Sequence, residues 1–251
     1  MGGQYSAVAT TPTPALVIYI FDISGSMAEA FEGSTRMEHV NNAIENSLSR
    51  MVRRSIKGEV IAPRYRLAMA AYSDTVLDML GGIESIAEVA PRGFPRLSAT
   101  NGTDTYSAFL WARDLLRGEL PNLSGKPAPM VCHLTDGHFT TDDPEPLAHE
   151  IMQMSNADGD VLLENIYLGE DLTSRSINDV QNWHGLSDAS DLRDPYARKL
   201  FNMSSPLPAS YAREIQKEGY SLREGTRMLI PGASKELVEL AFAVSGATPL
   251  R

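Results

Sequence analysis

The chain contains 251 residues, of which 32 are acidic and 22 basic, so its formal net charge at pH 7 is −10. A nucleic-acid partner requires a basic face and adsorption to anionic lipid requires a basic patch, so this charge argues against both. No apolar run reaches the length that spans a bilayer, while a hydrophobic content of 43% is ample for a core.

Strands and helices alternate from the first apolar run onward. Residues 1–14 carry two Thr-Pro pairs and are expected to form a flexible lead-in. The unbroken apolar run from Ala15 to Phe21 predicts a strand that is buried on both faces. Thr35-x-x-Glu38 is a capping-box pattern, and apolar residues recur after it at spacings of three and four, which predicts a helix that ends at Gly58.

The runs at 66–73 and 75–80 follow each other so closely that they predict an antiparallel hairpin. The later expected elements are a short helix at 83–89, a loop at 91–102, helices at 105–117 and 143–154, strands at 130–136 and 161–168, a helix at 209–218, a short strand at 226–230 and a helix at 235–244. This alternation predicts one α/β domain over residues 15–251. Its expected core is a doubly wound, mostly parallel six-stranded sheet with one antiparallel edge strand and helices on both faces, a Rossmann-like arrangement.

The segment at about 169–208 has no clear period and is long for a connection. Its Trp183, His184 and Tyr196 are candidates for a partner-binding surface. A loop that folds over a sheet edge and is pinned there by its aromatic side chains explains the same residues equally well.

A single cysteine, Cys132, lies inside an apolar run and cannot form an internal disulfide, so it is expected to be a small core residue. The first residues lack the basic start and apolar core of a signal peptide. Both features favour a reducing, cytoplasmic location.

Three oxygen-bearing side chains follow the first strand at alternate positions: Asp22, Ser24 and Ser26. Gly25 lets the backbone turn sharply between the two serines, so their oxygens and the carboxylate can point at one spot. Oxygen ligands suit a hard cation such as Mg²⁺. A strand that simply ends in a polar turn accounts for the same residues without a metal.

Two further segments carry matching groups. The strand expected at 130–136 ends in Thr135-Asp136-Gly137, and Thr103 lies in a polar loop just before a helical pattern. If the strands lie in the order 3-2-1-4-5-6, Asp22 and Asp136 end neighbouring strands at the point where that order reverses. Ligands of doubly wound sheets bind at this point, so we expect these residues and Thr103 to converge there.

The complete pattern resembles the von Willebrand factor A (vWA) domain: Asp22-x-Ser24-x-Ser26, then Thr103, then Thr135-Asp136-Gly137. In that family the five positions Asp22, Ser24, Ser26, Thr103 and Asp136 form the metal-ion-dependent adhesion site (MIDAS). The resemblance implies that they hold Mg²⁺, with Mn²⁺ or Ca²⁺ as substitutes, and that the Asp or Glu carboxylate of a partner protein completes the octahedral shell.

Among vWA proteins, the chain looks most like the stand-alone bacterial group that includes proteins of tellurium-resistance clusters. This resemblance implies a cytoplasmic adaptor in a bacterial stress or signalling assembly. The expected partner is then a protein kinase, a PP2C-type phosphatase or an AAA+ ATPase, with no nucleic acid and no membrane involved.

Two other functions stay open on the sequence: a passive scaffold subunit with a structural metal, and a metal-dependent hydrolase or phosphatase. Catalysis is not expected, because the second aspartate of aspartyl-phosphate phosphatases is replaced by Ser24 and no nucleophile elbow or phosphate-binding loop is present. Of the other polar residues near the motif, Thr105 and Asp143 are expected as helix caps, Asp104 as a solvated acid or an outer neighbour of the metal, and His133 as a hydrogen-bonded core residue.

Overall fold

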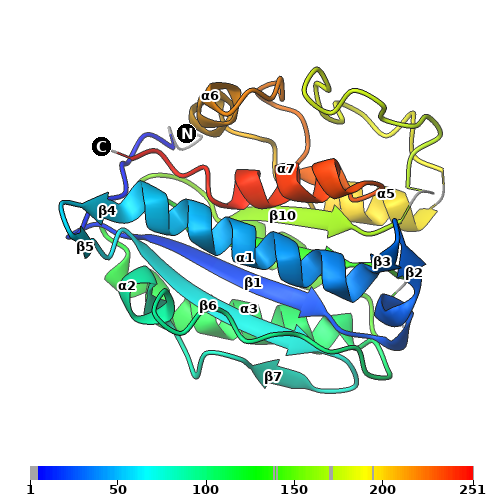
Figure 1. Cartoon of the computed structure of the whole chain (residues 1–251), viewed down its shortest axis with the longest axis horizontal. Helices are drawn as coiled ribbons and strands as arrows, with labels where there is room; N and C mark the ends of the chain where they lie inside the picture. The colour runs from blue at the N-terminus through cyan, green and yellow to red at the C-terminus, as the bar shows by residue number, and fades with distance from the viewer. Residues whose placement is uncertain (1–4, 138, 140, 170–171, 194, 251) are drawn as a thin grey trace.

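The computed structural model describes residues 5–137, 139, 141–169, 172–193 and 195–250. A central sheet lies between two layers of helices (Figure 1). Its strands lie in the order β11 (Leu229–Pro231), β10 (Leu162–Tyr167), β9 (Met130–Thr135), β1 (Ala15–Asp22), β6 (Tyr65–Tyr72) and β7 (Val76–Asp78). β7 and the two-residue β8 (Glu84–Ser85) pair antiparallel with β6, and the other pairings are parallel. The predicted doubly wound sheet and its strand order are therefore confirmed, with β8 as an addition at the edge.

Strand β1 lies at the centre of the sheet because its sequence is apolar on both faces. All eight of its residues are buried, and it pairs with β6 on one side and β9 on the other. Successive side chains point to opposite faces, so Val17 and Tyr19 enter one core and Ile18 and Ile20 enter the other.

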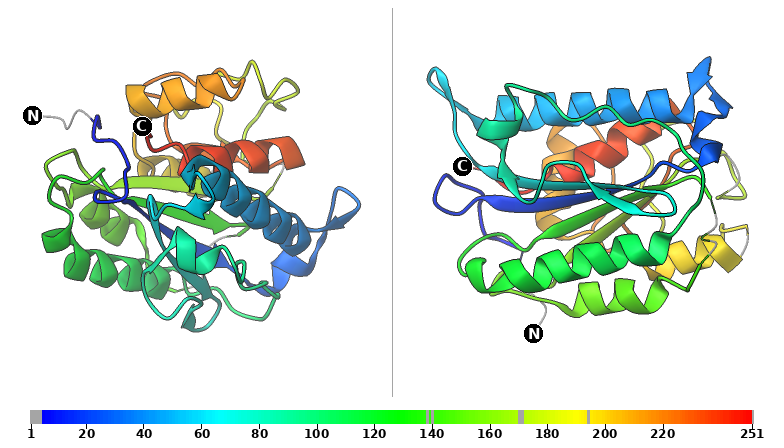
Figure 2. Two further views of the ribbon diagram at one scale, coloured as in Figure 1. Left: turned by 60° about the vertical axis from the view of Figure 1, so that its left-hand side comes forward. Right: turned by 90° about the horizontal axis from the view of Figure 1, so that it is seen from below.

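Helices cover both faces of the sheet (Figure 2). The helices on one face are α1 (Arg36–Ser55), α2 (Ile86–Val89), α6 (Ala209–Lys217) and α7 (Lys235–Ser245), and those on the other are α3 (Thr105–Glu119) and α4 (Glu145–Gln153). Short 3₁₀ helices lie at η1 (Gly25–Ala28) and η2 (Leu120–Asn122). Helix α1 begins where the capping pattern predicts, because the Thr35 hydroxyl accepts a hydrogen bond from the Glu38 amide at 3.2 Å. None of the helices in the described part of the chain combines the length and apolarity needed to cross a membrane.

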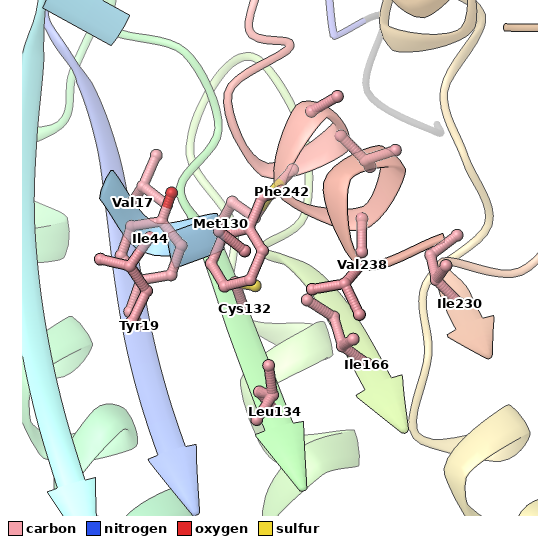
Figure 3. Close-up of a cluster of buried hydrophobic side chains, with 14 of the residues drawn as sticks. Val17, Tyr19, Ile44, Met130, Cys132, Leu134, Ile166, Ile230, Val238 and Phe242 are labelled. Carbon is pink, nitrogen blue, oxygen red and sulfur yellow. The ribbon is translucent and has the colours of Figure 1, made fainter. Parts of the chain in front are cut away.

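The larger core lies between the sheet and helices α1 and α7, where side chains of the central strands meet those of both helices (Figure 3). The Phe242 ring of α7 lies 6.1 Å from the rings of both Tyr19 and Phe21. Cys132 is fully buried in this core, which confirms its predicted role.

One residue of this core is a carboxylic acid. Glu164 of β10 is fully buried beside Cys132, its register partner on β9. Neither of its side-chain oxygens has a hydrogen-bond partner of good geometry among the described residues, and only the weakly polar Cys132 thiol lies against it. Burial therefore raises the pKa of Glu164 well above its ordinary value, because it disfavours the charged form.

Several local elements escape prediction. Two-residue strands form the hairpins β2 (Ala30–Phe31) with β3 (Ser34–Thr35) and β4 (Ile56–Lys57) with β5 (Val60–Ile61). Helix α5 (Pro195–Asn202) lies inside the segment that shows no period. Part of the lead-in is also packed, because Ala9 is fully buried and pairs with Leu250. Residues 1–4 of that lead-in lie outside the described part.

Candidate metal centre

The centre lies at the carboxyl ends of β1 and β9, two neighbouring parallel strands. β1 ends at Asp22, and β9 ends at Thr135, directly before Asp136. Within the sheet, β6 lies next to β1 on one side and the later strand β9 lies next to β1 on the other side. The strand order therefore reverses between β1 and β9. The convergence of Asp22 and Asp136 that the sequence predicts is present.

The hydroxyls of η1 meet the Asp136 carboxylate in one cluster of oxygens. Ser26 Oγ donates to Asp136 Oδ1 at 2.8 Å, and Ser24 Oγ lies 3.5 Å from the same oxygen. The two hydroxyl oxygens lie 3.0 Å apart. Three of the five predicted ligands therefore present their oxygens to one another.

Asp22, two residues before Ser24, is fully buried at the same centre, and the charge of Asp136 acts on it. Its Oδ1 accepts a hydrogen bond from the Ser24 amide at 2.8 Å, and its Oδ2 accepts one from the Thr135 hydroxyl at 2.9 Å. One bond fixes the carboxylate to the loop after β1 and the other fixes it to β9. Both strands that form the centre thus hold the same side chain.

Thr103 reaches the same rim through the loop before α3. The Thr100 amide donates to the Ile23 carbonyl at 2.6 Å, and the Asp104 amide donates to the Ser73 carbonyl at 2.7 Å. These bonds hold the loop against the ends of β1 and β6. Gly102 adopts a φ of +87°, and a Cβ there would lie 1.8 Å from Asp74 Oδ1, so the loop requires glycine at this position. Thr103 lies in this loop next to Gly102 and Asp104, and its role as a metal ligand stays a prediction.

Both carboxylates of the centre have raised pKa values. Burial raises the pKa of Asp22 to about 6, and the nearby Asp136 charge adds to the shift. Burial also raises the pKa of Asp136, although hydrogen bonds from Ser26 and the charge of Arg36 oppose that shift. A bound cation relieves the unfavourable burial of both negative charges.

The donor set fits a hard divalent cation. Serine and threonine hydroxyls and two carboxylates offer only oxygen, which Mg²⁺ and Ca²⁺ prefer. No group of three or more His, Cys, Asp or Glu side chains within the described ranges is arranged to hold a metal. A metal at this centre therefore depends on the hydroxyls as much as on the carboxylates.

A positively charged side chain that the motif does not predict, Arg36, also lies at the centre. Arg36 Nη1 donates to Asp136 Oδ2 at 3.0 Å, to Glu29 Oε2 at 2.9 Å and to the Ser26 carbonyl at 3.3 Å. Its only sequence signal is the cap at Thr35, which makes residue 36 the first residue of α1 and so places it at the rim.

Two buried tyrosines, Tyr72 and Tyr196, lie near the Asp22 carboxylate. Tyr72 is the register partner of Asp22 on β6. Tyr196 of α5 hydrogen-bonds to Thr135, and its ring lies 5.8 Å from that of Phe139. Burial raises the pKa of both phenols above their ordinary value. Because Tyr196 is buried and bonded to Thr135, it fixes its segment to the carboxyl end of β9.

The other two aromatic candidates of that segment also have neighbours in the chain. Trp183 is half-buried against the core, and His184 Nε2 lies 3.1 Å from an Arg223 guanidinium nitrogen. Residues 170, 171 and 194 of the segment lie outside the described part.

The helix caps differ in part from prediction. Asp104, and not Thr105, caps α3, because its Oδ1 accepts a hydrogen bond from the Ser107 amide at 3.1 Å. Thr105 is the first residue of that helix, and its hydroxyl donates to the Tyr72 phenol at 3.4 Å. At α4 the cap position is Pro144, although Asp143 Oδ1 still accepts a hydrogen bond from the Glu145 amide at 3.0 Å. Each predicted cap residue therefore lies one position away from the cap position that the structure shows.

His133 is the hydrogen-bonded core residue that the sequence predicts. Its Nε2 lies 2.8 Å from the Tyr72 phenol oxygen, and its Nδ1 lies 2.8 Å from Asn165 Oδ1. Burial lowers the pKa of His133 to about 4, so the ring is neutral at physiological pH.

No family model and no curated protein sequence matches this chain. Solved structures do resemble it. Proximal thread matrix protein 1 (PTMP1) from the mussel byssus superposes with a TM-score of 0.52 and 13% identity, over 96% of this chain and 47% of that one. The PilB minor pilin from Streptococcus sanguinis superposes with a TM-score of 0.53 and 9% identity, over 92% of this chain and 60% of the pilin. The SpRpn10 VWA domain gives a TM-score of 0.46 and 13% identity, over 91% of this chain and 93% of that domain.

The chain thus spans 47% of PTMP1 and 60% of the pilin. At such low sequence identities the likeness shows a shared fold and says nothing about shared chemistry. The strand order, the antiparallel edge and the helices on both faces agree with this likeness. The chain has the Rossmann-like fold of the von Willebrand factor A domain.

Proposed function

We propose that this chain is a metal-dependent protein-binding module. In this proposal Asp22, Ser24, Ser26, Thr103 and Asp136 hold a divalent cation, which captures a carboxylate of a partner protein. The observation that carries the proposal is the meeting of both serine hydroxyls with Asp136 Oδ1, next to a buried Asp22 that accepts from the Ser24 amide.

The donor chemistry supports Mg²⁺, with Mn²⁺ or Ca²⁺ as substitutes. A PTMP1 structure is described as having a zinc-occupied MIDAS motif, which supports a divalent ion at this kind of motif in that protein. When bound, the ion supplies an electropositive point at which a carboxylate replaces a water. The chain's own residues position it: Thr135 and the Ser24 amide fix Asp22, and Arg36 fixes Asp136.

The finer assignment is also a proposal. We infer an adaptor of the stand-alone bacterial type that includes tellurium-resistance proteins, acting in the cytoplasm in a stress or signalling assembly. Its partner would be a kinase, a PP2C-type phosphatase or an AAA+ ATPase that presents an acidic side chain. A binding role is further supported by His133, because both of its ring nitrogens are occupied and its low pKa leaves it a poor base.

A peptide array tests the central claim. We expect peptides that carry one Asp in a Gly-Ser background to be retained in 5 mM Mg²⁺ (roughly the millimolar range in which hydrated Mg²⁺ sites fill) and released by excess EDTA, whereas matched Asn peptides are not retained. Ser24→Ala combined with Ser26→Ala should abolish retention and leave the circular dichroism spectrum unchanged. Ser49→Ala, on the exposed face of α1, is the matched control and should bind as the wild type does.

The same preparation separates the alternatives. Retention that persists in EDTA, or a metal that raises the Tm without any peptide capture, would favour the passive scaffold. Turnover of p-nitrophenyl phosphate that is lost with Asp22→Asn would favour the hydrolase.

A further inference from the structure

Arg36 joins the metal centre from outside the five-residue motif. Its guanidinium contacts Asp136 Oδ2 at 3.0 Å, the oxygen that does not face the two serines. The Asp136 side chain has no exposed surface and that of Arg36 is 20% exposed, so this ion pair is shielded from water. A shielded pair keeps its electrostatic effect, whereas an exposed pair is screened by solvent and salt.

The protein holds Arg36 at both ends. Its backbone amide donates to the Glu29 carbonyl at 3.1 Å, and the adjacent Thr35 caps α1. Its Nη1 bonds to Asp136, Glu29 and the Ser26 carbonyl together. The hairpin β2–β3 connects Glu29 to Arg36 and closes this loop. Such restraint distinguishes Arg36 from a mobile surface charge.

The two carboxylate oxygens of Asp136 face different groups. Oδ1 faces the Ser24 and Ser26 hydroxyls, where the metal is proposed to lie, and Oδ2 faces a fixed positive charge. A divalent ion with Asp22 and Asp136 alone forms a neutral centre, whereas the same centre with Arg36 keeps one net positive charge. Glu29 changes this balance little, because its side chain is 63% exposed and is solvated by water.

We propose that Arg36 sets the charge of the metal centre and so determines its selectivity: it weakens metal binding and makes the loaded centre prefer a carboxylate over a neutral oxygen. This inference rests on the proposed function and names the regulation of that site. Arg36 is a positioning residue here, because it acts through Asp136 and through charge, without touching the partner.

Paired measurements on Arg36→Gln test the proposal. Isothermal titration of the EDTA-stripped protein with Mg²⁺ should show binding that is tighter than wild type by about threefold to tenfold, because a nearby positive charge is gone. Fluorescence anisotropy of labelled Asp and Asn peptides in saturating Mg²⁺ should show a preference for Asp reduced by about tenfold. Arg36→Gln should thus raise the Mg²⁺ affinity and lower the preference for Asp peptides, whereas simple disruption of the centre would lower both the Mg²⁺ affinity and the peptide affinity.

Three further variants complete the experiment. Arg36→Lys keeps the charge and should preserve both values to within about threefold. Glu29→Gln removes the exposed counter-charge and should shift both values the opposite way from Arg36→Gln, by a smaller factor. Arg96→Gln, which removes an exposed arginine paired with Glu38 on the same helix, should change neither.

The result that overturns the inference is a Mg²⁺ affinity of Arg36→Gln that is equal to or lower than that of the wild type. A wild type that binds Mg²⁺ without preferring Asp over Asn overturns it too. Failure of the wild type to bind Mg²⁺ at all overturns the proposed function, and this inference with it. If Arg36→Gln does not fold, Arg36→Met takes its place, and a Mg²⁺ affinity equal to or lower than that of the wild type again overturns the inference.

Discussion

Asp22→Asn is expected to stabilise the metal-free protein and to remove its response to Mg²⁺. In the absence of metal the Asp22 carboxylate is fully buried, and burial raises its pKa from 3.8 to about 6. A charged form that is disfavoured in this way destabilises the folded state at neutral pH by about 3 kcal/mol. Asparagine carries no charge, still accepts from the Ser24 amide, and pairs with Thr135. Allowing for weaker hydrogen bonds, we expect a net gain of about 2 kcal/mol, or a Tm increase of about 5 °C.

The pH dependence of this gain has a defined sign. Because the folded pKa of Asp22 lies above its ordinary value, the wild type loses stability as pH rises from 3.8 toward about 6. Asp22→Asn lacks this loss, so its advantage should be small near pH 4 and complete above pH 6, within about half a unit. Thermal unfolding in EDTA at about pH 4 and at about pH 7.5 measures the small and the complete advantage, because these values lie near the unfolded pKa and above the folded pKa.

Metal should reverse the comparison. Saturating Mg²⁺ at about 100 times its Kd adds about 2.7 kcal/mol to the wild type and nothing to the variant. Asp104→Asn is the matched control, because Asp104 lies on the same rim but its pKa is lowered, and Asn is an equally good cap. It should give no stabilisation and an unchanged Mg²⁺ response. An Asp22→Asn protein that still gains stability from Mg²⁺ would contradict the metal assignment.

Glu164→Met is expected to raise the stability of the whole domain. Glu164 is fully buried, and neither of its oxygens has a hydrogen-bond partner of good geometry within the described chain. Methionine has a similar volume and no polar atoms to desolvate. Removal of an unpartnered buried polar group should stabilise the protein by about 1–3 kcal/mol at neutral pH, measured by urea unfolding.

The Glu164 prediction also carries a pH test. The folded pKa of Glu164 is raised well above 4.5, so the wild type loses stability as pH rises above that value, while Glu164→Met does not. The difference between them should therefore grow with pH. Glu164→Gln keeps a buried polar group but cannot ionise at this position, so its stability should lie below that of Glu164→Met by an amount that does not change with pH. If Glu164→Met is less stable than the wild type at every pH, Glu164 has a structural role that its contacts do not reveal.

The framework of the fold could be predicted from the sequence because its central strands are buried on both faces. β1 is a continuous apolar run up to Asp22, β9 and β10 are mostly apolar, and all three lie within one residue of their expected ends. The motif residues follow from the same logic, since Asp22 and Asp136 end adjacent strands and topology alone brings them together.

What could not be predicted depends on contacts between distant segments. Helix α5 has two turns, too few to show a period, and it is held by Tyr196 against Thr135. Arg36 and Asp136 are 100 positions apart in the sequence, so no local sequence pattern predicts their ion pair. Glu164 lies in a strand that is buried on both faces, and only the three-dimensional core shows that its oxygens have no hydrogen-bond partner among the described residues.

The pairing of Ala9 with Leu250 has a practical consequence for handling the protein. Both segments lie at the end of the sheet opposite the carboxyl ends of β1 and β9 (Figure 1). A biotin or fluorescent group attached beyond either segment therefore sits on the far side from the oxygens of Ser24 and Ser26. Immobilisation on a sensor surface through either end would orient those oxygens toward the flowing solution.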